Sequence, residues 1–283
     1  LIVWFGIKKK KWKSVVLQFI ILTNIVYFTY QLFWGLLYFQ KSITQDLKKK
    51  EFSKQQIEKL SLAYLEKCKA SRKLVQEDKY GVFMIKDYHT LEQDILIAQT
   101  TIPKEYRIWN TSSKLTLKQS VFSKVLSYTG ISGYYNPFSA EAQFNAFQPP
   151  ISIPFTIAHE RAHQLGIARE QDANFYAYLL GLKTKNIELQ HSINWIVLKS
   201  LLAMQIKESS KFVENLKKSF NDGMNRDLQA EKDFFKKHKG LINETFSQTN
   251  DWFLKLNKQE GISTYAYFIY HVIEHDIKHS STP

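Results

Sequence analysis

A long uncharged stretch near the start of the chain dominates its hydropathy pattern. No charged residue lies between Ser14 and Gln40. A helix needs about 20 mainly apolar residues to cross the core of a bilayer, so the pattern predicts a transmembrane helix over residues 15–39. A buried core helix is disfavoured by this length. A cleaved signal peptide is disfavoured because no small-residue cleavage site follows the apolar run.

Aromatic residues flank this predicted span. Trp12 lies at one end, and Trp34, Tyr38 and Phe39 lie at the other. Tryptophan and tyrosine are enriched at the two surfaces of a membrane. We therefore expect these side chains to form interfacial belts.

Residues before the span indicate its orientation. Leu1 is not a methionine, so we expect an earlier segment, of which residues 1–7 would be the apolar end. Lysines at 8–11 and 13 would then form a short basic loop. Such loops stay in the cytoplasm, which predicts that the domain after Gln40 lies outside. Lysines at 41 and 48–50 weaken this asymmetry.

The rest of the chain reads as mainly helical, in an α+β class, with residues 1–40 as a membrane segment and 41–283 as one domain with a helical C-terminal part. Residues 130–147 alternate aromatic and polar positions around Gly133 and Asn136-Pro137, which predicts a small β element with a turn. An aromatic core hairpin is an equal alternative to a strand that borders a cleft. The predicted helices cover residues 45–75, 87–99, 154–166, 170 onward, 187–218 and 224–239. We expect the segments 187–218 and 224–239, rich in lysine and glutamate, to clad the domain.

A short motif, His159-Glu160-Arg161-Ala162-His163, carries the clearest chemistry. Residues four apart share one helix face, so both imidazoles can bind one metal ion. Glu160 can then take a proton from water at that metal. Pro154 can begin the helix and Gly166 can end it. Charged Arg161 requires solvent or an acidic partner on its face.

A catalytic zinc site needs a third protein ligand. Glu170 is the favoured candidate, because the turn allowed by Gly166 would return the next helix toward the metal. Asn174, one turn later, could hydrogen-bond a ligand. Glu188, His191 and the C-terminal histidines compete for the ligand role. Arg169 occupies the position of the third histidine in HExxHxxGxxH proteases, which excludes that variant.

The chain resembles an uncharacterised family of bacterial membrane proteins with a predicted zinc-metallopeptidase domain. The resemblance covers most of the chain, and its segments are residues 34–38, 130–138, 154–180, 253–255 and 261–265. The segment after the motif is also similar to that of ImmA/IrrE-type metallopeptidases. This resemblance implies a zincin-like domain and a gluzincin-like site of His159, His163 and Glu170, with Glu160 as the base. It implies no substrate.

Other groups could complete or rival this site. Tyr265, Tyr135 and Arg169 are alternative donors to an oxyanion on the scissile carbonyl. His271, His275 and His279 lie four apart near the C-terminus and could chelate a metal. Terminal segments fray and their histidines are usually solvated, so we disfavour a second metal site there.

Composition limits the remaining classes. The chain of 283 residues has a formal net charge of +13, and its lysines are spread without a zinc finger or RNP-like sequence. This favours a basic surface near anionic lipid over nucleic-acid binding. The single cysteine, Cys68, excludes an internal disulfide and a thiolate zinc site. No P-loop or dinucleotide fingerprint indicates another cofactor.

These observations predict a zinc-dependent metallopeptidase anchored in the bacterial cytoplasmic membrane, with its catalytic domain outside. Its partners would be the bilayer and a peptide or protein substrate. One alternative is a metal-binding membrane sensor or scaffold that cuts nothing. Another is a zinc hydrolase acting on a non-peptide amide of the cell envelope. The oligomeric state stays open.

Overall fold

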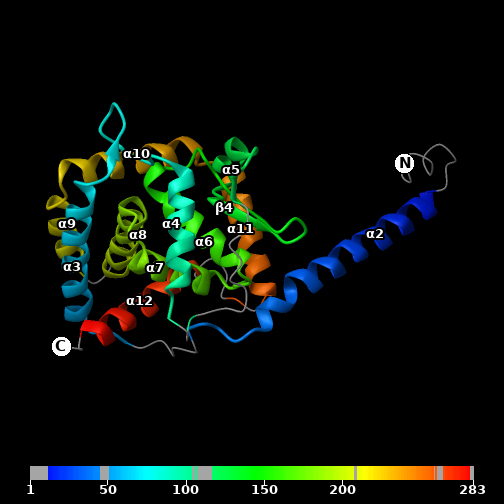
Figure 1. The fold of residues 1–283 in the computed structure, drawn as a ribbon. Coiled ribbons are helices and arrows are strands. Elements are labelled where there is room, and N and C mark those ends of the chain that lie inside the picture. Colours follow the sequence, from blue (N-terminus) through cyan, green and yellow to red (C-terminus); the bar gives the residue numbers. More distant parts are fainter. Residues whose placement is uncertain are drawn as a thin grey trace.

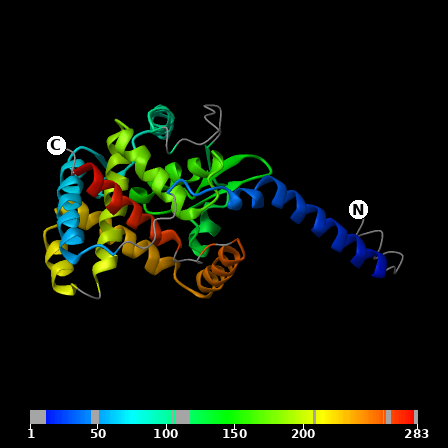
Figure 2. The same ribbon diagram turned by 90° about the horizontal axis from the view of Figure 1, so that it is seen from below.

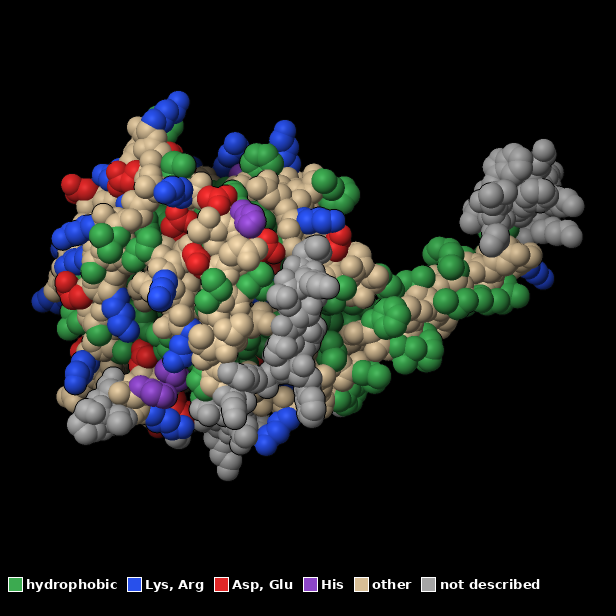
Figure 3. Space-filling view, in the orientation of Figure 1, with side chains coloured by type: hydrophobic (Ala, Val, Ile, Leu, Met, Phe, Trp, Pro, Cys, Tyr) green, Lys and Arg blue, Asp and Glu red, His purple; other side chains and the backbone are tan. Residues whose placement is uncertain are grey.

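A long apolar helix, α2 (Trp12–Phe33), projects from a helical domain in the computed structural model of the chain (Figure 1). The structure describes residues 12–44, 51–103, 106, 117–206, 209–257, 259 and 264–280. The predicted preceding apolar segment and most of the basic loop, residues 1–11, lie outside the described residues. Hydrophobic side chains cover the projecting helix (Figure 3) and are exposed along its length.

Helix α2 is long and apolar enough to cross a membrane, and it is the one such helix among the described residues. Its 22 residues span about 33 Å at 1.5 Å per residue, against about 30 Å for the bilayer core. Its exposure excludes the alternative of a buried core helix. The α-helix ends at Phe33 rather than at Phe39, and the 3₁₀ helix η1 (Gly35–Phe39) follows.

The predicted aromatic belt at this end is wrong for two of its members. Trp34 and Tyr38 are buried against the domain, together with Ala168, and only Phe39 is exposed. The side chain of Gln31 lies over Gly35, where a Cβ atom would come within 1.8 Å of its Oε1 atom. The chain therefore turns back onto the domain as soon as it leaves α2.

The domain is built mainly of helices, several of which pack against α8 (Figures 1 and 2). Their bounds are α3 (Lys54–Arg72), α4 (Tyr88–Thr100), α5 (Ser123–Thr129), α6 (Ile153–Gln164), α7 (Glu170–Lys183), α8 (Ile187–Gln205), α9 (Ser210–Lys218), α10 (Asp222–His238), α11 (Leu241–Leu256) and α12 (Thr264–Ser280). Another 3₁₀ turn, η3 (Pro150–Ser152), precedes α6. Local capping fixes several starts: Ser53 and Gln56 form a capping box on α3, and Asp87 caps α4.

The expectation that residues 187–218 form one cladding helix is wrong. They form two helices, and the first, α8, is a core element in which Trp195, Leu198 and Leu201 are fully buried. Helix α8 packs against α3, α6, α7 and α12. Helix α8 itself contains one glutamate, Glu188, and one lysine, Lys199; most of the lysine and glutamate of the predicted segment lies in residues 207–218.

A small sheet precedes the motif helix, as predicted. Strands β3 (Leu117–Gln119), β5 (Glu141–Phe144) and β4 (Gly133–Asn136) lie in that order. Strand β5 pairs in parallel with β3 and antiparallel with β4, with Gly133 opposite Phe144. A separate two-stranded sheet joins β1 (Gln76–Glu77) to β2 (Phe83–Met84). The mainly helical fold with a small β element is therefore confirmed.

Helix α12 is docked in the core rather than frayed. Tyr64 of α3 and Tyr178 of α7 both donate hydrogen bonds to Asp276, at 2.8 and 2.6 Å. His271 is buried against Phe175, and only His279 is well exposed. The expectation that these histidines are solvated is wrong for His271.

The buried imidazole of His271 predicts a pH dependence of stability. Burial lowers the pKa of His271 to about 4, against about 6.5 in an unfolded chain. Between these values the unfolded state binds the extra proton, so stability falls as pH falls. From pH 7 to pH 5, the wild type should lose about 2 kcal/mol of unfolding free energy more than His271→Leu does.

Urea unfolding of the full chain in detergent micelles measures this difference. His279→Leu, at an exposed position of the same helix, is the matched control and should behave as wild type. An equal loss in His271→Leu and wild type would contradict the assignment.

Candidate metal centre

Helix α6 places the two motif histidines on one face. Pro154 lies in its first turn, and Gly166 adopts a left-handed φ of 95° just after its end. Two backbone hydrogen bonds close that turn: the Gly166 N–H donates to the His163 carbonyl oxygen (2.9 Å), and the Ile167 N–H donates to that of Ala162 (3.1 Å). The His159 and His163 rings lie with centroids 4.6 Å apart. The predicted start and end of this helix are confirmed.

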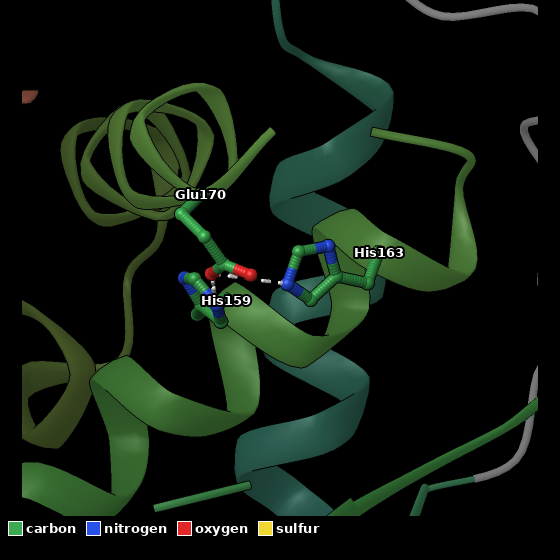
Figure 4. Close-up of side chains that lie close together, drawn as sticks. All are labelled: His159, His163 and Glu170. Atoms are coloured by element: carbon green, nitrogen blue, oxygen red, sulfur yellow. Dashed lines mark ion pairs between the residues drawn. The ribbon is translucent and has the colours of Figure 1, made fainter. Parts of the chain in front are cut away.

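The turn after Gly166 returns the chain so that Glu170 is the first residue of α7. Its Oε2 atom lies 3.1 Å from Nε2 of His159 and 3.5 Å from Nε2 of His163 (Figure 4). Donor atoms on a tetrahedron with bonds of about 2.05 Å are separated by about 3.3 Å. The spacing of these three side chains therefore fits ligands of a single metal ion, and their ligand atoms all lie within 4.8 Å.

A hydrogen bond orients one of the two histidines. Nδ1 of His163 lies 2.6 Å from the carbonyl oxygen of Ile167. When Nδ1 carries the proton and donates it there, Nε2 keeps a free lone pair for a metal, as in most histidine ligands. Nδ1 of His159 is buried without a hydrogen-bond partner among the described residues.

Burial and charge act against each other at this cluster. Burial by itself lowers the pKa of His163, but the carboxylates of Glu170 and Glu160 outweigh it and raise that pKa to about 9. Burial likewise raises the pKa of Glu170, yet the two histidines hold it well below its usual range. The site therefore attracts positive charge, from protons or from a metal ion.

Glu160 lies buried beside this cluster. Burial raises its pKa to about 7, against the opposing effect of both histidines. Its Oε2 atom has no hydrogen-bond partner among the described residues. Strand β4 packs directly against it: a Cβ atom on Gly133 would lie 2.6 Å from Glu160 Oε1 and 2.8 Å from its Cγ. Gly133 therefore permits the close approach of β4 to the carboxylate.

The segment that leaves the apolar helix forms another wall of the site. The Trp34 ring meets the His163 ring edge to face, with centroids 5.6 Å apart, and it also packs against Tyr135 of β4 at 4.9 Å. Arg169 donates a hydrogen bond to the carbonyl oxygen of Tyr38 at 3.2 Å. The segment after α2, residues 34–44, thus contacts both α6 and the N-terminus of α7.

Two hydroxyl groups complete this attachment. Ser42 and Thr44 donate hydrogen bonds to Oδ1 of Asp172, in the first turn of α7, at 2.8 and 3.0 Å. The Asp172 side chain is buried. These two hydrogen bonds lie within the predicted domain of residues 41–283, whereas the contacts of Trp34 and Tyr38 cross its predicted boundary at residue 40, which itself stays a prediction.

Competing ligands lie elsewhere. Glu188 accepts a hydrogen bond from the backbone of Lys86, and His191 pairs with Ser71 at 2.8 Å in the core. Neither belongs to the group of described residues that could hold a metal ion, and neither do the α12 histidines. Of the sequence candidates for third ligand, the structure brings only Glu170 to His159 and His163.

Helix α6 buries its charged Arg161. The guanidinium donates a hydrogen bond to Gln164 at 3.0 Å and interacts electrostatically with Glu92 of α4. The sequence predicts that Arg161 faces either solvent or an acidic partner, and the structure places it near the acidic Glu92. Asn174 is buried one turn after Glu170, and its role in supporting a ligand stays a prediction.

The predicted oxyanion donors differ in placement. Tyr135 lies half-buried on β4 beside Trp34, and burial raises its pKa, which keeps the phenol protonated. Arg169 is the N-cap of α7, with its guanidinium turned to Tyr38. The side chain of Tyr265 lies outside the described residues. Among the three, Tyr135 is the donor on the strand that borders Glu160.

Comparison with known proteins adds the family. The family described as "Protein of unknown function (DUF3810)" matches residues 1–273. The chain belongs to this family. The DUF3810 match extends over the apolar helix, the sheet and the metal-site helices together, and it carries no relation to metallopeptidases. No curated protein and no solved structure matches the chain.

Sequence reasoning misses three neighbours of the DUF3810 site. Gly133 was read as part of a turn, although a glycine inside a strand signals close approach of another group. Trp34 was assigned to the membrane surface, and no local pattern links it to His163, 129 positions away. Gln259 was also missed, and it accepts a hydrogen bond from the backbone nitrogen of Glu170 at 3.1 Å.

The three-donor geometry predicts the effect of removing a donor. Purified wild-type protein should bind one zinc ion per chain, and His163→Ala or Glu170→Ala should weaken binding more than about a hundredfold. Mass spectrometry of bound metal and competition with a chelator measure both. His89→Ala, an exposed histidine on α4, is the control. Retention of zinc by both ligand variants would rule out the site.

The contact between β4 and Glu160 predicts an energetic coupling. Gly133→Ala should lower the unfolding free energy by about 1–3 kcal/mol, because the added Cβ overlaps Glu160. The loss should shrink in a Glu160→Ala background, where Oε1 and Cγ are absent. Denaturant unfolding of wild type, the two single variants and the double variant completes a double-mutant cycle that measures this coupling. Gly240→Ala, where a Cβ meets open space, should be close to neutral, and equal losses in both backgrounds would exclude the coupling.

Proposed function

We propose that this protein is a membrane-anchored, zinc-dependent peptidase. The observation that carries the proposal is the buried group of His159, His163 and Glu170 with the carboxylate of Glu160 beside it. A binding site alone requires only the three donors. A fourth, uncoordinated acid at the same site is what metal-assisted hydrolysis adds.

The donor set favours zinc among biological metals. Two imidazole nitrogens and one carboxylate oxygen make up the ligands of many catalytic zinc sites, which keep the fourth position for water or substrate. The orientation of His163 by the Ile167 carbonyl is the usual support for such a ligand. The residues present therefore fit this ion.

In the proposed mechanism, His159, His163 and Glu170 would hold zinc, which would supply a Lewis acid that lowers the pKa of water toward neutral pH. Glu160 accepts the proton that the attacking water releases and then delivers it to the leaving amine. The pKa of about 7 that burial gives Glu160 suits a group that must both take and return a proton. Its unpartnered Oε2 atom leaves one oxygen available for this task.

The position of strand β4 favours a peptide as the substrate. It is an edge strand of the three-stranded sheet and abuts Glu160 through Gly133. An extended peptide can add to such an edge by main-chain hydrogen bonds, which would bring its carbonyl groups past the metal centre. Tyr135, on the same strand, would then donate a hydrogen bond to the oxyanion.

The membrane part of the proposal rests on α2. We infer that α2 spans the cytoplasmic membrane and that the domain lies outside the cytoplasm, as the lysines at 8–11 and 13 favour. The burial of Trp34, next to the end of α2, against His163 would hold the metal centre close to the bilayer.

Replacing the proposed base tests the mechanism. Glu160→Gln should keep zinc and fold while losing hydrolysis of peptides by at least about a hundredfold, since it cannot accept the proton. The full chain in detergent is incubated with a proteome-derived peptide library, and new termini are identified by mass spectrometry. Glu214→Gln, at an exposed position on α9, should cleave as wild type.

The outcomes separate the proposal from its rivals. Cleavage by Glu160→Gln at the wild-type rate would remove Glu160 from the mechanism. Absence of cleavage by zinc-loaded wild type, together with full rescue of a deletion strain by Glu160→Gln, would establish a non-catalytic role instead.

A further inference from the structure

Helix α11 turns its apolar side away from the protein. Positions advance about 100° per residue around a helix, and six large hydrophobic residues of α11 fall within an arc of about 140°. All six are exposed; they form what we name the α11 apolar face: Leu241, Ile242, Phe246, Trp252, Phe253 and Leu256. Leu241 is 81% exposed, Trp252 64% and Leu256 61%.

The opposite side of α11 holds it on the domain. Leu254 is its one buried residue among those described. Asn243 reaches α5, since a Cβ atom on Gly130 would lie 2.5 Å from its Nδ2 atom. A surface helix normally buries its apolar stripe against the core. In α11 the apolar side is exposed instead, so we infer that this face contacts something outside the domain.

The position of α11 relative to α2 indicates what the α11 apolar face contacts. The Phe253 ring contacts the ring of Tyr30, in the last turn of α2, edge to face with centroids 6.4 Å apart. Figures 1 and 2 place α11 beside the domain end of α2, crossing its direction rather than running along it. If α2 spans a bilayer, α11 therefore lies at the level where α2 leaves it.

We propose that the α11 apolar face lies in the interfacial layer of the same bilayer that α2 crosses. This inference rests on the membrane-spanning role of α2 in the proposed function. Interfacial helices place tryptophan, phenylalanine and leucine on the lipid side and polar residues on the other. The contact between Phe253 and Tyr30 makes the face continuous with the lipid-exposed surface of α2. The domain then has two membrane contacts, which fix its tilt relative to the bilayer.

Site-specific labelling of the full chain tests this arrangement. A Cys68→Ala background removes the one native cysteine, and single cysteines replace Ile242, Leu256 or Ser247. Ser247 is exposed on the polar side of α11 and is the matched control. Each carries a nitrobenzoxadiazole fluorophore. The proteins are reconstituted into vesicles of phosphatidylethanolamine and phosphatidylglycerol, with or without bromine on the acyl chains.

Brominated lipid should quench the fluorophore at 242 and 256 about threefold more than at 247. Equal quenching at the three positions would overturn the inference. Blue-shifted emission at 242 and 256 without lipid quenching would also overturn it, because the face would then be covered by protein, such as a second copy of the chain.

Alkaline extraction of the same vesicles separates this inference from its premise. Protein that stays with the vesicles has α2 inserted, so the quenching result bears on α11 alone. Protein that is released lacks a spanning α2, which removes the membrane part of the proposed function and the role of α11 with it.

Discussion

Two carboxylates and two imidazoles share one buried volume between α6 and α7, and the rest of the site is arranged around that electrostatic constraint. Burial opposes charge on every one of these groups. Glu170 resolves this by pairing with both histidines at 3.1 and 3.5 Å, whereas Glu160 keeps a raised pKa and an oxygen without a partner among the described residues. An unpaired buried carboxylate is costly, so its retention beside three metal-type donors favours chemistry over stability.

The local part of this arrangement could be predicted from the sequence. His159 and His163 share a face through helical periodicity, and Gly166 ends the helix with a left-handed φ that few other residues adopt. Glu170 follows within a few residues, so the short turn leaves little freedom in where it lies. Each of these steps depends on neighbours in the chain, and local rules therefore sufficed.

The remainder depends on contacts between distant segments, which local patterns do not encode. Trp34 suits a membrane surface as well as a protein wall, and only the fold decides in favour of His163. The charged residues at 207–218 gave the whole segment 187–218 a polar composition, although its first part, α8, is buried in the core. Conversely, His271 near the C-terminus is buried because Asp276, five positions later, ties α12 to two tyrosines of other helices.

The attachment of residues 34–44 has a consequence for any shed form of this protein. Cleavage after Gln40 would release the domain without Trp34 and Tyr38, and would leave the edge of His163 and the Arg169 guanidinium open to water. Water in that gap raises the local dielectric constant, which weakens the interactions between the charges at the cluster. The intact chain and the form cleaved after Gln40 would therefore have the same donors but different reactivity, and residues 34–40 are a structural component of the candidate centre.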